Sequence, residues 1–288
     1  MAEVHPTRDA YLLRLGLEAE EPTAAALFRL HRAHVERIPY ETLWIHLGER
    51  PSIDARDSYQ LTAAGRRGGY CFHLNGAFSE LLADLGYDVV RHVGGVYGPE
   101  GPTGDALTNH LALTVHGLAT PDNPSGTWYV DVGLGDAMYE PLPLVAGVYH
   151  QGPFSLELTE TPGGIADWRL RHDPRGAFAG MCWTVARARP DAFDARHLWL
   201  STSPDSGFVK VLTMQRRDSA GVDALRGLVL RRVDASSTES DLTTKAQLLA
   251  VMRDVFGVDL DEIDPNQVDH LWTRLDRSHE AWDAAGRP

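Results

Sequence analysis

One change of pattern along the chain limits its fold more than any other feature. Over the first 86 residues the apolar side chains recur at helical spacing, whereas from about Tyr87 they alternate with polar ones at a period of two. The alternating segments are short and are separated by turns rich in Gly, Pro, Asn and Asp. Helices followed by closely spaced strands indicate an α+β fold with an antiparallel sheet or small barrel.

The clearest helix follows Gly68-Gly69. Its apolar residues recur along one stripe that would face a core, and Gly86 would end it. The stripe consists of Cys71, Leu74, Phe78, Leu81 and Leu85. We therefore predict that Cys71 lies in the first turn of this helix, at the head of the buried stripe.

Further elements follow from the same patterns. A helix is expected from about Pro22 to Pro39, where the second proline stops it. Six strands are expected at residues 88–97, 109–116, 127–132, 154–159, 167–172 and 179–185. After a helix-like segment at 191–203, we expect strands at 208–215 and 228–233, and helices at 246–256 and beyond Asp264.

Charge and cysteine content exclude several classes of protein. The chain carries 27 Lys and Arg against 40 Asp and Glu, a net charge of −13, which repels nucleic acid and anionic membrane surfaces. Two cysteines cannot build a disulfide framework. No uncharged apolar run approaches the ~20 residues that span a bilayer. We therefore expect a soluble, cytoplasmic protein without nucleic-acid or membrane partners.

Cys71 is the first candidate for chemistry. The thiolate is the reactive form of cysteine, and the positive end of a helix dipole favours it. The Gly pair before Cys71 would let the chain turn sharply and leave backbone N–H groups accessible near the sulfur. A buried structural cysteine is the alternative interpretation, because cysteine is among the most buried residue types.

A nucleophilic thiol needs a base and a group that orients the base. His110 begins the strand at 109–116 and points away from its apolar face, and Asp131 lies in the otherwise apolar segment Trp128–Val132. The alternatives are a structural histidine for His110 and an ion pair with an arginine for Asp131. The order Cys, His, Asp is that of papain-like and transglutaminase-like thiol enzymes, which indicates a thiol acyl-transfer site.

Five segments resemble the arylamine N-acetyltransferase family. The segment Arg66–Asn75 is similar to the family's Arg-Gly-Gly-x-Cys-Phe-Glu-x-Asn signature, and the other four occur in the family's order. These four are Arg37–Leu43, Asn109–Leu111, Asp131–Gly135 and Ser201–Phe208. The similarity covers roughly residues 5 to 215, and the remainder matches in coarse organisation only.

The resemblance implies a three-part fold around a papain-like Cys-His-Asp core. Residues 1–90 would form a helical bundle that carries the nucleophile, and residues 91–190 a β-barrel that carries the histidine and aspartate. Residues 191–288 would form a linker helix and an α/β lid.

The resemblance also implies the reaction. Cys71 would take the acetyl group of acetyl-CoA as a thioester and pass it to an arylamine, hydrazine or N-hydroxyarylamine, as in xenobiotic metabolism. His110 would hold the thiol proton, and Asp131 would orient the imidazole. The partners would be CoA and a small-molecule amine, and a second copy of the chain is a further candidate partner, in a homodimer.

Other positions carried over from the family concern the substrates. The acceptor pocket would be lined by Tyr40, Val96, Leu134 and Phe208, and CoA would lie against Gly133 and Gly135. Tyr40 and Leu134 stand where the family usually has Phe, and the loss of a ring at Leu134 would widen the acceptor slot.

The resemblance also gives expectations for Glu41, Arg67 and His73, which are near the predicted site in sequence. Glu41 and Arg67 would match a structural ion pair, with a solvated pair as the alternative. His73 replaces the family's Glu and would lie about 200° around the helix from Cys71, out of contact with the sulfur. No second Cys or His pair with zinc-like spacing accompanies it, so we expect no metal.

Three other functions use the same residues. An amide synthase of this fold would join a carrier- or CoA-bound acyl chain to an aryl amine in natural-product biosynthesis, and a wider slot at Leu134 favours it weakly. A hydrolase would use water to resolve the thioester. A binding module of the same fold would have no catalysis, although all three triad residue types are present.

Overall fold

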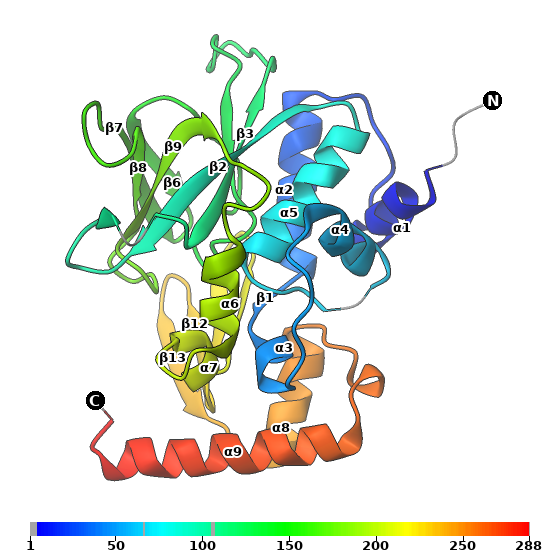
Figure 1. Ribbon diagram of the computed structural model, residues 1–288, viewed down its shortest axis with the longest axis vertical. Coiled ribbons are helices and arrows are strands. Elements are labelled where there is room, and N and C mark those ends of the chain that lie inside the picture. Colours follow the sequence, from blue (N-terminus) through cyan, green and yellow to red (C-terminus); the bar gives the residue numbers. More distant parts are fainter. Residues whose placement is uncertain (1–4, 66, 105–106, 288) are drawn as a thin grey trace.

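The structure is a computed structural model that describes residues 5–65, 67–104 and 107–287. A group of helices and a curved sheet lie side by side, and a second sheet with the C-terminal helices lies below both in the view of Figure 1. Arg66, the first residue of the expected signature, lies outside the described residues. So do residues 1–4 of the predicted division 1–90 and residue 288 of the predicted division 191–288. In the part of the chain that is described, no helix is long and apolar enough to cross a membrane.

The described residues of the N-terminal part form five helices: α1 (Pro6–Leu15), α2 (Ala24–Arg37), α3 (Leu43–His46), α4 (Ala55–Ala63) and α5 (Cys71–Asp84). The side chain of Thr23 caps α2 by accepting a hydrogen bond from the Ala26 N–H. As predicted, α2 ends before Pro39, because a residue that precedes proline disfavours helical backbone. Ile38 accordingly has extended geometry.

Helix α5 differs from its prediction in one respect. It begins at Cys71 as expected, but it is buried on every side over residues 71–79 rather than along one stripe. The reason is its place in the middle of the molecule: α1 and α4 contact it, and strands β2 (Asp88–Tyr97) and β3 (His110–His116) contact it too. A helix enclosed in this way is buried around its whole circumference.

The central sheet has eight antiparallel strands in the order β5-β4-β3-β2-β9-β8-β7-β6 and curves into a barrel (Figure 1). Besides β2 and β3 it contains β4 (Trp128–Val130), β5 (Leu142–Pro143), β6 (Gly147–Gln151), β7 (Phe154–Glu160), β8 (Trp168–Arg171) and β9 (Gly180–Arg187). The six predicted strands are all present. Sequence patterns missed β5 and β6, which are the short strands at the two edges of the sheet.

The C-terminal part begins with α6 (Asp194–Thr202) and α7 (Gly207–Lys210) and contains a second antiparallel sheet, ordered β1-β10-β11-β12-β13. Its strands are β1 (Tyr40–Glu41), β10 (Thr213–Arg217), β11 (Val222–Arg226), β12 (Val229–Val233) and β13 (Ser237–Asp241). Helix α8 (Lys245–Ala250), a π-helical turn (Val251–Val255), a 3-10 turn (Leu260–Glu262) and α9 (Pro265–Ala284) follow.

The strand predicted at residues 208–215 was wrong over its first half. Residues 207–210 form α7, because the hydroxyl of Ser206 accepts the Phe208 N–H at 3.1 Å and starts a helical turn there. The strand itself begins only at Thr213.

The C-terminal sheet and core take in residues from the first 90. Strand β1 pairs with β10, so Tyr40 lies opposite Gln215. Leu43 and Leu47, in and just after α3, belong to the same core cluster as Leu248 and Leu271 of the C-terminal helices. In Figure 1 α3 accordingly lies beside α8 and above α9.

Candidate active site

Cys71 opens α5 beside the strand that carries His110. Its Sγ lies 3.6 Å from the backbone oxygen of Asn109, the residue directly before His110. The side chain is 97% buried, since its exposed fraction is 3%. The predicted nucleophile, Cys71, and the predicted base, His110, therefore meet where the N-terminal end of α5 lies against the start of β3.

His110 and Asp131 form a buried pair. His110 Nε2 lies 2.7 Å from Asp131 Oδ2, and both side chains are almost fully enclosed. Because Nε2 faces the carboxylate, Nδ1 is the ring nitrogen left for Cys71. The arginine ion pair that was the alternative for Asp131 is therefore not what the structure contains: the carboxylate faces a histidine.

The Asp131 carboxylate has four donors around it. Oδ1 accepts from Asn75 Nδ2 at 2.7 Å and from the Gly133 N–H at 3.0 Å. Oδ2 accepts from the Tyr129 hydroxyl at 2.7 Å and from His110. A buried carboxylate with all its acceptor positions filled is satisfied as an ion, which offsets the cost of its burial.

The charges of this pair follow from the geometry. Burial by itself would lower the pKa of His110, but the negative charge of Asp131, and then Cys71, raise it to about 10. Burial would likewise raise the pKa of Asp131, but the charge and hydrogen bond of His110 outweigh this and hold that pKa below its usual range. At neutral pH the pair is an imidazolium facing a carboxylate.

Sequence reasoning gave no role to two residues that complete the site. Asn75 donates to Asp131 and to the Leu111 oxygen, and its own oxygen accepts the Val132 N–H at 2.9 Å. Tyr129 donates to Asp131 from the same strand. Both had a signal: position 75 is one helical turn from Cys71 on the same face, and position 129 shares a strand face with 131.

Gly133 and Gly135 allow close approach within the protein. A Cβ at Gly133 would lie 2.7 Å from the Cys71 Cα, and one at Gly135 would lie 2.1 Å from Gln215 Oε1. Gly135 also has a φ of +74°, which other residues rarely adopt. Their assignment to CoA stays a prediction, and of the two only Gly133 is among the described residues that line the cavity next to Cys71.

A cavity of about 930 Å³ opens onto Cys71 and His110. It lies at the upper end of the usual range for ligand sites, about 300–1,000 Å³. The four residues predicted to hold the acceptor all line it, namely Tyr40, Val96, Leu134 and Phe208. The Phe208 ring is nearly perpendicular to that of Tyr40, with centroids 6.4 Å apart, and is inclined by 62° to that of Tyr70, with centroids 5.1 Å apart.

The outer part of the same cavity is cationic. Arg196, Lys210, Arg226 and Arg231 line it, and Glu239 is the acidic residue among its described lining residues. This excess of positive charge runs against the net charge of the chain, −13. The cavity reaches as far as Trp282 of α9.

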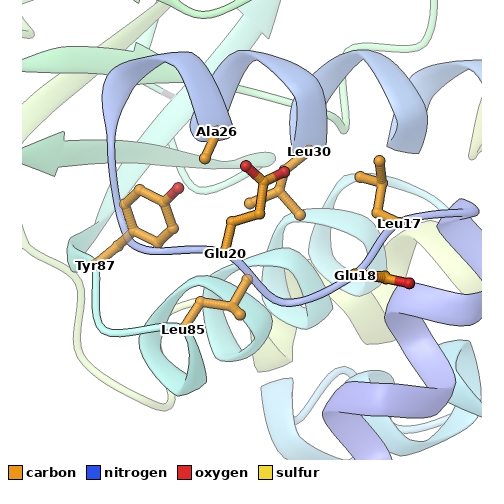
Figure 2. A pocket seen from close by; sticks show the side chains of 7 residues that line it. All are labelled: Leu17, Glu18, Glu20, Ala26, Leu30, Leu85 and Tyr87. Atoms are coloured by element: carbon orange, nitrogen blue, oxygen red, sulfur yellow. The ribbon is translucent and has the colours of Figure 1, made fainter.

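A second hollow, of about 10 Å³, is lined by the segment before α2, by α2 itself and by the end of α5 (Figure 2). It holds one water molecule at most. Two acidic residues, Glu18 and Glu20, line it, and Glu20 pairs with Arg29. The hollow contains no member of the Cys-His-Asp set and therefore offers no chemistry.

The ion pair predicted between Glu41 and Arg67 is wrong. Arg67 forms its ion pair with Glu49, at 3.0 Å, and not with Glu41 as expected. Glu41 is fully buried, and one of its oxygens accepts the Leu43 N–H. Arg67 instead stacks on the Trp44 ring, 3.8 Å from its centroid. The short α3 turn brings Trp44 and Glu49 to Arg67, and sequence spacing does not show that.

His73 is buried beside the site, and the other residues give no metal centre. Its ring packs perpendicular to Tyr70, with centroids 4.6 Å apart, and burial lowers its pKa to about 4. In residues 5–65, 67–104 and 107–287, no three or more His, Cys, Asp or Glu side chains are grouped so that they could hold a metal ion.

Comparison with known proteins gives a consistent result. A family model described as N-acetyltransferase matches residues 23–264. The arylamine N-acetyltransferase of Mycolicibacterium smegmatis is 30% identical over 264 residues, which cover 88% of this chain and 92% of that protein. Proansamycin X synthase of Amycolatopsis mediterranei is 32% identical over 164 residues, which cover 55% of this chain and 60% of that one.

Solved structures agree. The structure of Mycobacterium marinum arylamine N-acetyltransferase in complex with CoA superposes with a TM-score of 0.79 at 28% identity, covering 93% of this chain and 98% of that chain. The match extends over both sheets and the helices around them, because so little of either chain is left out.

Proposed function

Since the chain belongs to the arylamine N-acetyltransferase family, and is therefore an acyltransferase, we propose that it moves an acetyl group from acetyl-CoA to an arylamine, hydrazine or N-hydroxyarylamine through a thioester on Cys71. The observation that carries this mechanism is the buried His110–Asp131 pair at 2.7 Å beside the Cys71 thiol. These residues would act as a nucleophile, a base and an orienting group.

In the first half-reaction the Cys71 sulfur attacks the thioester carbonyl of acetyl-CoA. His110 Nδ1 already holds the thiol proton, as part of an imidazolium that Asp131 stabilises, and that proton passes to the departing CoA thiolate. In the first turn of α5 the His73 N–H donates to the Tyr70 oxygen at 2.9 Å, so the N–H groups of Cys71 and Phe72 would be the ones that face the oxyanion next to Sγ.

In the second half-reaction the amine attacks the acetyl-Cys71 thioester. A C–N bond forms as the C–S bond breaks, and His110 accepts the proton that the amine nitrogen loses. An aniline suits this step because it is unprotonated near neutral pH. The cavity-lining rings of Tyr40 and Phe208 support a flat acceptor, since aryl rings pack on such edges and faces.

The outer cavity supports CoA as the donor. Arg196, Lys210, Arg226 and Arg231 would meet the phosphates of CoA, which guanidinium and ammonium groups bind through charge-assisted hydrogen bonds. The residues that line the cavity include both Cys71 and Trp282 of α9, so the cavity extends between these two parts of the protein, as a long donor requires.

An amide synthase of the same fold is the second candidate. Two observations favour it: the similarity to Proansamycin X synthase and a cavity of about 930 Å³ in which Leu134 stands where the family usually has Phe. The donor would then be a carrier- or CoA-bound acyl chain.

Three further predictions concern the whole protein. Placement in the cytoplasm fits the two free thiols, Cys71 and Cys182. The homodimer and the division of the chain at residues 90 and 190 remain predictions.

Intact-mass analysis after mixing with acetyl-CoA tests the proposal. We expect the wild-type protein to gain one acetyl group, about 42 Da, and an added aniline or hydrazine to remove it. Cys71→Ala should gain nothing, and Cys182→Ala should behave as wild type. An adduct that persists in Cys71→Ala would contradict the mechanism, and loss of the adduct in buffer as fast as with amine would indicate a hydrolase.

Failure to form any adduct with acetyl-CoA would move the donor elsewhere. The amide-synthase candidate predicts that a longer acyl thioester, or an acyl chain on a carrier protein, modifies Cys71 where acetyl-CoA does not. The same mass measurement with those donors distinguishes the two functions.

A further inference from the structure

The backbone of the cavity residue Phe208 is held by a buried histidine from a distant part of the chain. His46, the last residue of α3, lies with Nε2 2.9 Å from the Phe208 carbonyl oxygen. A carbonyl oxygen only accepts, so Nε2 must carry the ring proton and donate it. His46 and Phe208 are 162 residues apart in sequence, and no motif connects them.

The other face of the His46 ring meets the C-terminal helix. Arg274 of α9 places Nη2 2.5 Å from His46 Nδ1 and 3.2 Å from the His46 carbonyl oxygen. A guanidinium only donates, so Nδ1 is the acceptor, and Arg274 selects the neutral tautomer with its proton on Nε2. Burial, and then the charge of Arg274, lower the pKa of His46 to about 4, which keeps the ring neutral.

Arg274 is partly exposed, and its hydrogen bonds go to His46. Among the described residues no carboxylate forms an ion pair with it, so water and His46 solvate its charge. Its hydrogen bonds to His46 therefore hold a cation at the point where α9 meets α3. The chain of contacts runs from α9 through His46 to the carbonyl of Phe208.

Phe208 needs such an external contact. It lies in α7, a helix of four residues, and a helix that short is not stable on its own. Its ring lines the cavity together with Tyr40 and packs on Tyr70 behind it, so a small shift of α7 displaces the surface on which an acceptor ring would pack.

We propose that His46 and Arg274 are positioning residues for the amine half-reaction: α9 fixes the acceptor wall by holding Phe208 through His46. This inference rests on the proposed function, in that Phe208 belongs to the acceptor pocket. It assigns the two residues no contact with acetyl-CoA or with Sγ.

Four variants separate positioning from general stability. His46→Leu and Arg274→Met break the chain of hydrogen bonds. His46→Gln preserves it, because one amide group can donate to Phe208 and accept from Arg274. The matched control is Gln267→Ala, which removes the other α9–α3 hydrogen bond, from Gln267 Nε2 to the Leu47 oxygen at 3.0 Å, and leaves His46 untouched.

The two half-reactions are measured separately. For His46→Leu and Arg274→Met we expect the rate of Cys71 acetylation at saturating acetyl-CoA, where a displaced Lys210 in α7 no longer limits donor binding, to stay within about twofold of wild type, while KM for an aniline rises about five- to tenfold. His46→Gln should lie closer to wild type than His46→Leu, and Gln267→Ala should match wild type. Circular dichroism and Tm identify any variant that fails to fold, in which case the remaining members of the set carry the comparison.

Binding of aniline to the unacetylated protein gives a second readout that needs no acetyl transfer. Tryptophan fluorescence is suited to it because Trp199 and Trp282 line the cavity. We expect Kd for aniline to rise about five- to tenfold in His46→Leu and Arg274→Met.

The inference would be overturned if aniline binding were unchanged in those two variants or if both half-reactions were lost in parallel. An equal effect of Gln267→Ala, or a wild-type protein that binds no aniline, would overturn it too. If wild-type protein binds aniline but forms no acetyl-enzyme, the proposed function fails and the binding measurement still decides the inference.

Discussion

Asp131 shows how much a single residue depends on its surroundings. Four donors from three separate parts of the chain surround its carboxylate, in α5, at the start of β3, and in β4 and the turn after it. Removal of any one of these donors would leave a buried carboxylate acceptor without a partner, which costs about 1–3 kcal/mol of folding free energy. The ionised state of Asp131, and through it the protonated state of His110, is therefore a property of this arrangement.

Removing one of these donors should weaken catalysis without destroying the fold. Tyr129→Phe deletes only the hydroxyl that donates to Asp131 Oδ2. We expect the amine-transfer kcat/KM to fall about tenfold and the free energy of unfolding to fall by about 1–2 kcal/mol, measured by steady-state kinetics and urea denaturation. Tyr149→Phe, whose hydroxyl bonds to the Val145 oxygen on the surface, is the matched control. Equal effects of both changes would show that the Asp131 contact has no special role.

Glu41 should make stability depend on pH. Burial raises its pKa from 4.5 to about 7, because the cost of burying the charge exceeds the attraction of Arg67. The folded protein thus keeps the Glu41 proton to a higher pH than the unfolded chain does, and the contribution of this group to stability falls as pH rises from about 4.5 to 7.

The neutral variant Glu41→Gln tests this sign. It should unfold at higher urea concentration than wild type at pH 8, with a free energy of unfolding larger by about 2–3 kcal/mol, and the difference should vanish near pH 5. Glu157→Gln, on the surface beside Arg171, should show no such trend. A variant less stable than wild type at pH 8 would mean that the Arg67 attraction dominates.

At the scale of elements, the site depends on how closely the turn after β4 approaches α5. Gly133 lies against the first residue of that helix, where an added Cβ would lie 2.7 Å from the Cys71 Cα. Backbone cannot give way as the end of a flexible side chain can. The turn and the helix would have to separate, and Asn75 and Asp131 would separate with them.

We therefore expect Gly133→Ala to lower Tm by several degrees and to slow Cys71 acetylation at least about tenfold, because ~1 Å of misplacement suffices for such a loss. Gly98→Ala is the control: a Cβ there meets no atom within 4 Å, and Gly98 has no left-handed φ. Differential scanning fluorimetry and the acetylation rate check both variants. A fully active Gly133→Ala would show that α5 and the turn tolerate the shift.

At the scale of the whole molecule, the parts are joined by segments that cross from one to another. Strand β1 supplies an edge of the C-terminal sheet, and Thr42 exchanges hydrogen bonds with Thr213 at 3.0 Å. Leu43 and Leu47 fill the C-terminal core. A fragment that begins at residue 191 would lack all of these.

The full chain should therefore unfold in one step. We expect tryptophan fluorescence and far-UV circular dichroism to give the same urea midpoint, and a fragment of residues 191–288 to remain unfolded on its own. Two resolved transitions, or a folded fragment with a cooperative melt, would instead support independent parts with boundaries close to residue 190.

Features that depend on neighbours along the chain could be predicted before the fold was known. Helix α5 starts after its glycine pair, the six main strands alternate, and the order Cys71, His110, Asp131 is visible in one reading, because local pattern and motif carry these features. The residue types of a thiol acyl-transfer site were likewise evident, and the resemblance named the family that the comparisons support.

Contacts between residues far apart in the chain could not be predicted, because they depend on how the elements pack. That Arg67 pairs with Glu49 rather than Glu41, that Phe208 lies in a helix, and that His46 joins α9 to the cavity all depend on contacts between elements far apart in the chain. The burial of α5 on all sides has the same origin. Spacing along a chain fixes which side chains share a face, but the packing of one element on another decides what that face meets.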